Sequence, residues 1–257
     1  MTDASLTVSQ VLCITGMHRS GTSLTASWLE RCGLPVHGSE SHGPATGNPK
    51  GHFEDKQFVD LHASAIRARE PETAGWRTSA EEEIPIDREG LETARRLIET
   101  RSRKHPVWGW KDPRTVFFLN QWKALLPELR VLLIWRPHDV VTRSLLHRSE
   151  AAENPVFKLT PAEARSLWHT HNKMVCAYKR AHPHDSLLVP LDRIIRDDRS
   201  VHRAICDRLG FALAYRPLSL VFDNELMSKQ GSPGTQGDRA ALLERELMAL
   251  SDLRSDG

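Results

Sequence analysis

Four short runs of apolar residues lie along the chain without the polar alternation of a half-exposed strand. Strands that read as continuous apolar runs are typical of parallel sheets covered on both faces. Helical patterns separate the runs, which favours βαβ units. The pattern therefore predicts an α/β fold with a central parallel β-sheet flanked by helices. The predicted strands are VLCIT (11–15), VWGWK (107–111), VLLIW (131–135) and LLVPL (187–191).

Helical spacing of apolar residues predicts four helices. The second has a capping box, because Thr160 and Glu163 can each accept a hydrogen bond from the other's backbone N–H. Pro161 suits the first position of that helix, where no N–H is needed. Gly33 and Gly210 can end the first and third helices. The predicted helices cover residues 20–31, a segment from about 160 to 178, 200–209 and 239–250.

The length of 257 residues suits a single domain, 1–257. Two segments rich in glycine, proline and polar residues, 34–54 and 229–237, interrupt the regular patterns. Loops at the carboxyl ends of parallel strands are where α/β proteins place their sites. Both segments are therefore predicted to be active-site or lid loops.

Charge and cysteine content exclude several classes of protein. Thirty-five basic and 33 acidic side chains leave a net charge of +2, too balanced to indicate nucleic acid or an anionic membrane as partner. The four cysteines form no CxxC pair, which favours reduced thiols over zinc or disulfides. No basic region precedes an apolar run at the N-terminus, and no stretch has the length of a membrane span. We therefore expect a cytoplasmic protein.

The first predicted strand runs directly into the segment GMHRSGTS (16–23). A strand, a glycine turn and a helix N-terminus make an anion site, because backbone N–H groups point inward and the helix dipole adds positive charge. Arg19 can hold two oxygens at once, and the hydroxyls can donate hydrogen bonds. The segment predicts a P-loop-type three-layer fold, with phosphate bound by Gly16, Met17, His18, Arg19, Ser20, Gly21, Thr22 and Ser23.

The loop differs from that of a P-loop NTPase. There, lysine follows the second glycine and a carboxylate at a strand end holds Mg²⁺. Here Thr22 stands at the lysine position, and Arg136 ends the strand 131–135. The site thus offers fixed positive charge where an NTPase has a metal ligand, which predicts an anionic nucleotide bound without metal.

A second phosphate element follows the third strand, in WRPHDVVTRSLLHRS (135–149). Arg136 ends the strand and Ser144 lies eight residues later, so both can reach one phosphate at the carboxyl edge of the sheet. We interpret Arg143 and Arg148 as part of a solvated basic helix face. Two phosphate sites on one sheet predict a nucleotide phosphorylated at both its 5′ and 3′ positions.

These two elements resemble those of the PAPS-dependent sulfotransferases, whose phosphosulfate loop reads GxxRSGTT or GxxKSGTT. The family's 3′-phosphate element, an arginine closing a strand and a serine eight positions later, matches Arg136 and Ser144. Further segments resemble the bacterial branch or the family's strand-then-helix element. They are NPKGHFED (48–55), WGWKDPR (108–114) and VPLDRIIRDDRSVHRAICDRLGF (189–211), so the resemblance runs from about residue 10 to residue 211.

The resemblance implies an enzyme that moves a sulfuryl group from 3′-phosphoadenosine-5′-phosphosulfate (PAPS) to a hydroxyl or amine, leaving adenosine 3′,5′-bisphosphate. It implies no metal, and an acceptor such as a carbohydrate or small metabolite. The family's glycine-rich 3′-phosphate loop is echoed by Lys229 and Gly231. The histidine base of the cytosolic branch would fall at Pro113, so that base is excluded here. No oligomeric state is predicted.

The resemblance also implies catalytic groups. Arg19 and the loop amides stabilise charge on the leaving oxygen. Carboxylate-using branches place their base after the first helix, so Glu54 is the first candidate and Asp55 the second, with Glu40 and His52 remaining open.

Lys111 and Arg114 end the second strand. Lys111 can approach the sulfuryl oxygens or the acceptor, and Asp112 can orient Lys111 or an arginine. A structural salt bridge at the strand end explains the same residues equally well.

Two other functions remain open. One is a P-loop kinase acting on a small molecule, which Thr22 at the lysine position disfavours. The other is a non-catalytic protein that binds a bisphosphonucleotide.

Overall fold

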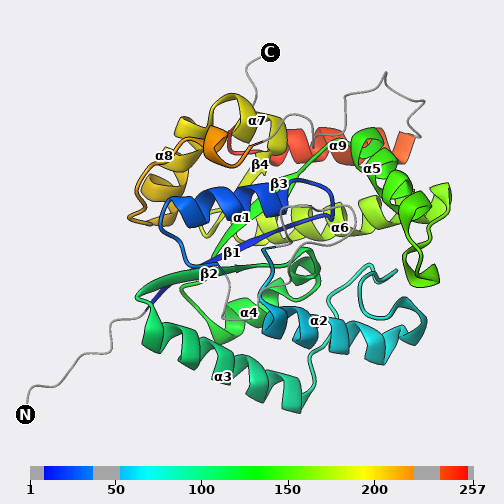
Figure 1. Ribbon diagram of the computed structural model, residues 1–257, viewed down its shortest axis with the longest axis horizontal. Helices are drawn as coiled ribbons and strands as arrows, with labels where there is room; N and C mark the ends of the chain where they lie inside the picture. The colour runs from blue at the N-terminus through cyan, green and yellow to red at the C-terminus, as the bar shows by residue number, and fades with distance from the viewer. Residues whose placement is uncertain (1–8, 37–52, 223–237, 254–257) are drawn as a thin grey trace, which may run out of the picture.

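The computed structural model describes residues 9–36, 53–222 and 238–253. At its centre lies a four-stranded parallel sheet in the order β2-β1-β3-β4 (Figure 1). Every bound lies within one residue of the predicted run, so the predicted α/β class with its central parallel sheet is confirmed. The strands are β1 (Gln10–Gly16), β2 (Val107–Lys111), β3 (Arg130–Trp135) and β4 (Ser186–Pro190).

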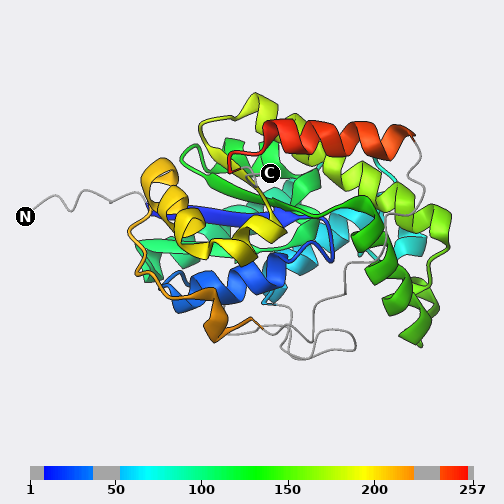
Figure 2. The ribbon, with the colours of Figure 1, turned by 90° about the horizontal axis from the view of Figure 1, so that it is seen from above.

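Helices cover both faces of the sheet. One face carries α1 (Thr22–Arg31), α7 (Leu191–Arg196) and α8 (Asp198–Leu209). Figure 2 shows α1 and α9 on opposite sides of the sheet. The other face carries α2 (Lys56–Arg69), α3 (Arg88–Lys104), α4 (Leu119–Leu125), α5 (His138–Ala151), α6 (Pro161–Ala181) and α9 (Asp238–Leu250). Short 3₁₀ turns are η1 (Pro71–Thr73), η2 (Pro113–Phe117), η3 (Pro155–Phe157) and η4 (Leu218–Leu220).

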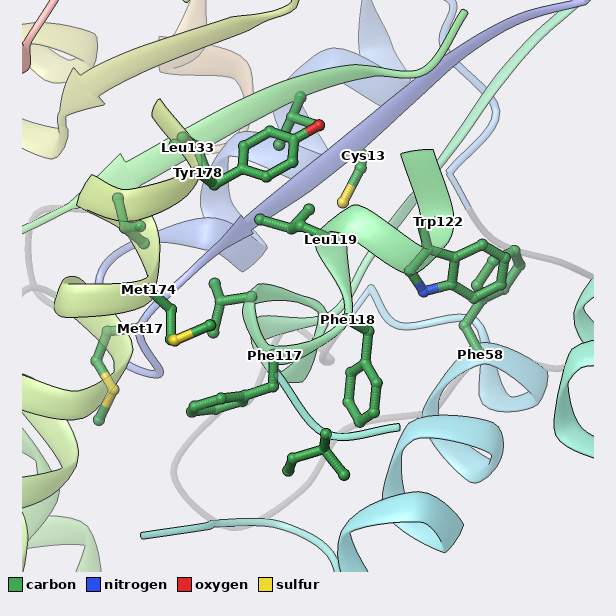
Figure 3. Packing of buried hydrophobic residues seen from close by; sticks show 14 of the residues in the cluster. Cys13, Met17, Phe58, Phe117, Phe118, Leu119, Trp122, Leu133, Met174 and Tyr178 are labelled. Carbon is green, nitrogen blue, oxygen red and sulfur yellow. The ribbon is translucent and has the colours of Figure 1, made fainter. Parts of the chain in front are cut away.

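The two faces explain why the strands read as unbroken apolar runs. Successive side chains of a strand point to opposite faces, so each run fills two cores. In β1, Leu12 and Ile14 face α1, α7 and α8, whereas Val11 and Cys13 join the larger core on the other side. That larger core contains aromatic rings among aliphatic and sulfur-containing side chains, as Figure 3 shows around Trp122, whose ring centroid lies 5.2 Å from that of Phe58.

Helix bounds differ from the prediction where the backbone leaves the right-handed region. α1 begins at Thr22, two residues after the predicted start, because Arg19 and Gly21 have φ angles of 68° and 90°. The capping box of α6 is formed as predicted by Thr160 and Glu163. α8 begins at Asp198, two residues before the predicted start.

Several helices of the structure were not predicted from the sequence. Segments α2, α3, α4 and α7 were not predicted as helices, although the side chains of Asp55 and Asp87 cap α2 and α3. A helix that carries Arg143 and Arg148 was expected without bounds, and it is α5. Of the predicted loop 34–54, the structure describes 34–36 and 53–54, which form no helix or strand. Residues 37–52 and the predicted loop 229–237 lie outside the described residues. Within the described ranges, no helix is both long enough and apolar enough to span a membrane.

Candidate active site

The glycines of the 16–23 segment are required by close contacts. A Cβ on Gly16, whose φ is 143°, would lie 2.0 Å from the carbonyl oxygen of Ile134 on the neighbouring strand. A Cβ on Gly21 would lie 2.4 Å from Cδ1 of Leu191. Gly21 is the N-cap of α1 and offers no side-chain acceptor to the first-turn N–H groups. The loop therefore ends in an uncapped helix N-terminus, which suits an anion.

The side chains of the loop divide into buried and ligand-facing candidates. Met17 and Ser20 are fully buried, so they offer the site their backbone groups. His18 packs edge-on against the rings of Trp76 and His171, at centroid distances of 6.0 and 5.6 Å. Burial, with Arg114 nearby, lowers the pKa of His18 well below its ordinary value, so its imidazole is neutral. Arg19 and the hydroxyls of α1 are therefore the side chains through which this loop can bind an anion.

The two predicted phosphate elements meet in space. Arg19 of the loop donates from Nε to the hydroxyl oxygen of Ser144 on α5, at 2.9 Å. Ser144 is buried. It lies at the edge of the sheet where the parallel strands β1 and β3 both have their carboxyl ends. Since its oxygen accepts from Arg19, its hydroxyl hydrogen is available to another acceptor.

Arginine side chains gather at this edge. Burial lowers the pKa of Arg19, Arg136 and Arg148, and the charges of Arg148 and Arg136 lower that of Arg19 further. Arg143, by contrast, is exposed and pairs with Asp139 at 3.4 Å. A cluster of half-buried guanidinium groups that repel one another is stabilised by a bound anion.

The burial of Arg148 differs from the interpretation made from the sequence. Arg148 was assigned to a solvated helix face together with Arg143, yet it is half-buried and its charge is felt by Arg19 and His18. The missed signal is its spacing, because Arg148 follows Ser144 by four residues and so shares its helix face.

Glu54 and Lys111 form a buried ion pair beside these arginines. Lys111 ends β2 and donates from Nζ to Oε1 of Glu54 at 2.7 Å. The other carboxylate oxygen, Oε2, lies 4.0 Å from Nη1 of Arg114. The charge of Glu54 also acts on Arg148, raising its pKa against the effect of burial. The candidate base, the strand-end lysine and the arginine cluster therefore form one continuous site.

Asp55 has a different environment. One carboxylate oxygen accepts from the backbone N–H of Gln57 at 3.0 Å, which caps α2. The other accepts from Nε of Arg101 at 3.1 Å and from a second nitrogen of the same guanidinium. Both oxygens are thus used in holding the start of α2, which favours Glu54 over Asp55 as the candidate base.

Asp112 orients Arg114 and not Lys111. Its Oδ1 accepts from the backbone N–H of Arg114 at 3.0 Å and from Nη1 at 2.8 Å. Its Oδ2 contacts Nδ1 of His62 at 2.8 Å, and Nε2 of His62 lies 2.8 Å from the indole nitrogen of Trp122. Because an indole N–H can only donate, Nε2 must accept and Nδ1 must carry the hydrogen. His62 is therefore neutral, and the contact is a hydrogen bond.

The environment of Asp112 keeps it ionised. Burial opposes the charged form, but the guanidinium of Arg114 and the hydrogen bond from His62 hold the pKa of the carboxyl well below its ordinary value. The sequence did not indicate His62, since it belongs to no motif and lies on a helix that was not predicted.

Other candidates remain untested by the structure. Lys229, Gly231, Glu40 and His52 lie outside the described residues. Within the described ranges, no group of three or more His, Cys, Asp or Glu side chains is arranged to hold a metal ion.

Comparison with known proteins identifies the family. A family model described as Sulfotransferase family matches residues 12–215. A sulfotransferase from Alicyclobacillus acidocaldarius has a similar fold, with 15% identity and a TM-score of 0.53 over 94% of this chain and 96% of that one. The sulfotransferase domain of the Synechococcus PCC 7002 olefin synthase is also similar, with 18% identity and a TM-score of 0.51 over 91% of this chain and 93% of that domain. The sequence matches no curated protein. Because the family model covers most of its length, the chain belongs to the sulfotransferase family.

Proposed function

We propose that the protein transfers a sulfuryl group from PAPS to a hydroxyl or amine of an acceptor such as a carbohydrate or small metabolite, releasing adenosine 3′,5′-bisphosphate. The observation that supports this best is the buried Glu54–Lys111 pair beside the Arg19, Arg136 and Arg148 cluster. A carboxylate that can take a proton thus lies next to cations that suit a polyanionic donor.

The donor's two anionic ends fit separate groups of residues. The 5′-phosphosulfate suits the amides of the 16–23 loop and the uncapped N-terminus of α1. The 3′-phosphate suits Arg136 and the hydroxyl of Ser144. Both elements lie at the carboxyl ends of parallel strands, where α/β proteins bind nucleotides.

The transfer itself requires one proton movement and one bond exchange. Glu54 takes the acceptor's hydroxyl proton as the acceptor oxygen forms a bond to sulfur. The bond between sulfur and the bridging oxygen breaks, and the electron pair stays on the 5′-phosphate. Arg19 and Lys111 stabilise the charge that develops on the bridging oxygen. Catalysis then depends on positioning and electrostatics.

Binding measurements with two nucleotides separate this proposal from a kinase. A ligand at 100 times its Kd stabilises the native state by about 2.7 kcal/mol, which raises the Tm of a domain of this size by roughly 5 °C or more. We expect that shift with adenosine 3′,5′-bisphosphate in the absence of metal. A shift with ATP-Mg²⁺ alone would support a small-molecule kinase.

A transfer assay separates the proposal from a protein that only binds the nucleotide. Incubation with ³⁵S-labelled PAPS and a panel of sugars, phenols and amines is expected to label at least one acceptor. Tight bisphosphate binding without labelling across the panel would favour the non-catalytic protein.

A further inference from the structure

Arg114 is held by hydrogen bonds from its side chain and from its backbone. Its Nη1 donates to Oδ1 of Asp112 at 2.8 Å and its Nε donates to the carbonyl oxygen of Gly75 at 3.0 Å. Its backbone N–H donates to the same Asp112 oxygen at 3.0 Å. These contacts engage opposite sides of the side chain, so the guanidinium cannot rotate without breaking one of them.

Asp112, the carboxylate that accepts from Arg114, is itself held by a second hydrogen bond. His62 donates from Nδ1 to Oδ2 of Asp112, while its ring stacks on Phe118 at a centroid distance of 4.7 Å. Trp122 ends the chain of hydrogen bonds at Nε2 of His62 and packs against Phe58 in the core (Figure 3). Both oxygens of Asp112 are thus held by neighbours, and all three side chains of this chain are fully buried.

Glu54 lies between two cations, Lys111 and Arg114. Lys111 reaches it with a single ammonium on a flexible stem, and in the proposed reaction this ammonium is needed at the bridging oxygen. Arg114 stands 4.0 Å from the other oxygen of Glu54. Burial lowers the pKa of Arg114, but the charges of Asp112 and Glu54 more than offset this and raise it. The charge of Glu54 therefore acts directly on the Arg114 guanidinium.

We infer that Arg114 is a positioning residue, which keeps the Glu54 carboxylate in place when Lys111 moves its hydrogen bonds to the transferring group. Asp112 and His62 serve the same role one step further from the reaction, because they fix Arg114. The inference rests on the proposed sulfuryl transfer, and it assigns Arg114 a role beyond a salt bridge at the strand end.

Kinetics of crossed variants test this role. Arg114→Ala is expected to lower kcat about 10- to 100-fold, since small misplacements of reacting groups have effects of this size. Its Kd for adenosine 3′,5′-bisphosphate should change less than about threefold, because Arg114 is assigned to Glu54 and not to the donor. In a Glu54→Gln background the same substitution should lower kcat less than about threefold. Equal losses in both backgrounds would mean that Arg114 acts independently of Glu54 and would overturn the inference.

Two further variants guard against loss of the fold. Arg114→Lys keeps the charge but replaces the two nitrogens that contact Asp112 and Gly75 by a single ammonium, so we expect an intermediate kcat with unchanged bisphosphate binding. Arg130→Ala removes an arginine that pairs with Asp185 at the opposite end of β3, and it should leave transfer unchanged. A loss with Arg130→Ala equal to that with Arg114→Ala would show a general effect on stability and overturn the inference.

A measurement without turnover separates this inference from the proposed function. Urea unfolding of wild type, Arg114→Ala, Glu54→Gln and the double variant gives the coupling between the two side chains. We expect a coupling of about fivefold in the unfolding equilibrium constant. If the wild type transfers no sulfuryl group, the proposed function fails, yet a coupling of this size still supports the Arg114–Glu54 contact. Additive effects would overturn that contact whether or not the protein is active.

Discussion

Replacing Glu54 by alanine tests two roles of the Glu54–Lys111 pair, one in the stability of the fold and one in sulfuryl transfer. The side chains are 10% and 2% exposed, so the substitution leaves a buried ammonium without its carboxylate. Breaking one partner of a buried pair destabilises a protein by about 3–5 kcal/mol. For a domain of this size that is a fall in Tm of roughly 6–20 °C. Loss of a general base should also lower transfer about 10²- to 10⁴-fold.

A second substitution distinguishes the two effects. Replacing a buried ion pair by apolar side chains is often neutral, so the Glu54→Ala, Lys111→Met double variant should regain most of the lost Tm. It should not regain transfer, because no proton acceptor returns. Differential scanning calorimetry and the labelled-PAPS assay measure the two quantities on the same samples.

An exposed ion pair on α2 provides the matched control. Asp60→Ala breaks an exposed pair with Lys56 on α2 and should change the free energy of unfolding by less than about 1 kcal/mol. If Glu54→Ala keeps full transfer, the base assignment is wrong. If Glu54→Ala is as stable as wild type, the reasoning about the buried pair is wrong.

Arg136→Ala should weaken binding of adenosine 3′,5′-bisphosphate by at least about 10-fold by calorimetric titration, because charge-assisted hydrogen bonds contribute about 1.5–3 kcal/mol; Arg143→Ala, which removes an exposed charge, should leave it unchanged. Gly21→Ala should abolish bisphosphate binding, since the new Cβ meets Leu191 at 2.4 Å and φ is 90°; binding equal to wild type would contradict the loop geometry. Burial, with Arg114 nearby, lowers the pKa of His171 to about 4. The unfolded chain therefore takes up this proton first as pH falls from about 6.5, and roughly 3 kcal/mol of stability is lost by pH 4. His171→Gln should make the urea midpoint depend less on pH between about 6.5 and 4. The same pH dependence as in the wild type would refute the assignment.

The elements that sequence predicted best are those whose signal is local. Each strand appeared as an apolar run, because a buried parallel strand needs apolar residues on both faces. The capping box at Thr160 and the two glycines of the 16–23 loop were equally readable, since each meets a requirement of the nearby backbone. That Arg136 and Ser144 bind one phosphate stays a prediction, and the contact that the structure shows joins Ser144 to Arg19.

The rest of the site depends on contacts between distant segments. Asp112 and His62 are 50 residues apart and meet only because α2 packs over the end of β2. Asp112 lies in the segment WGWKDPR, but His62 belongs to no motif, so sequence left open whether Asp112 orients Lys111 or an arginine. Arg148 was misassigned for a related reason: the burial of a helix face depends on which elements cover it, and α5 had no predicted neighbour.

The hydrogen bond from Arg19 to Ser144 has a consequence for how the proposed donor binds. Arg19 belongs to the 5′ element and Ser144 to the 3′ element, yet one contact of 2.9 Å joins them. While its oxygen accepts from Arg19, the serine hydroxyl can still donate its hydrogen, and a 3′-phosphate accepts such a hydrogen bond. In turn, a phosphate that draws on this hydroxyl increases the negative charge of the serine oxygen and so strengthens its hold on the Arg19 guanidinium. In the proposed complex, one connected set of groups contacts both ends of the donor, and a nucleotide without a 3′-phosphate should leave Arg19 less well oriented for transfer.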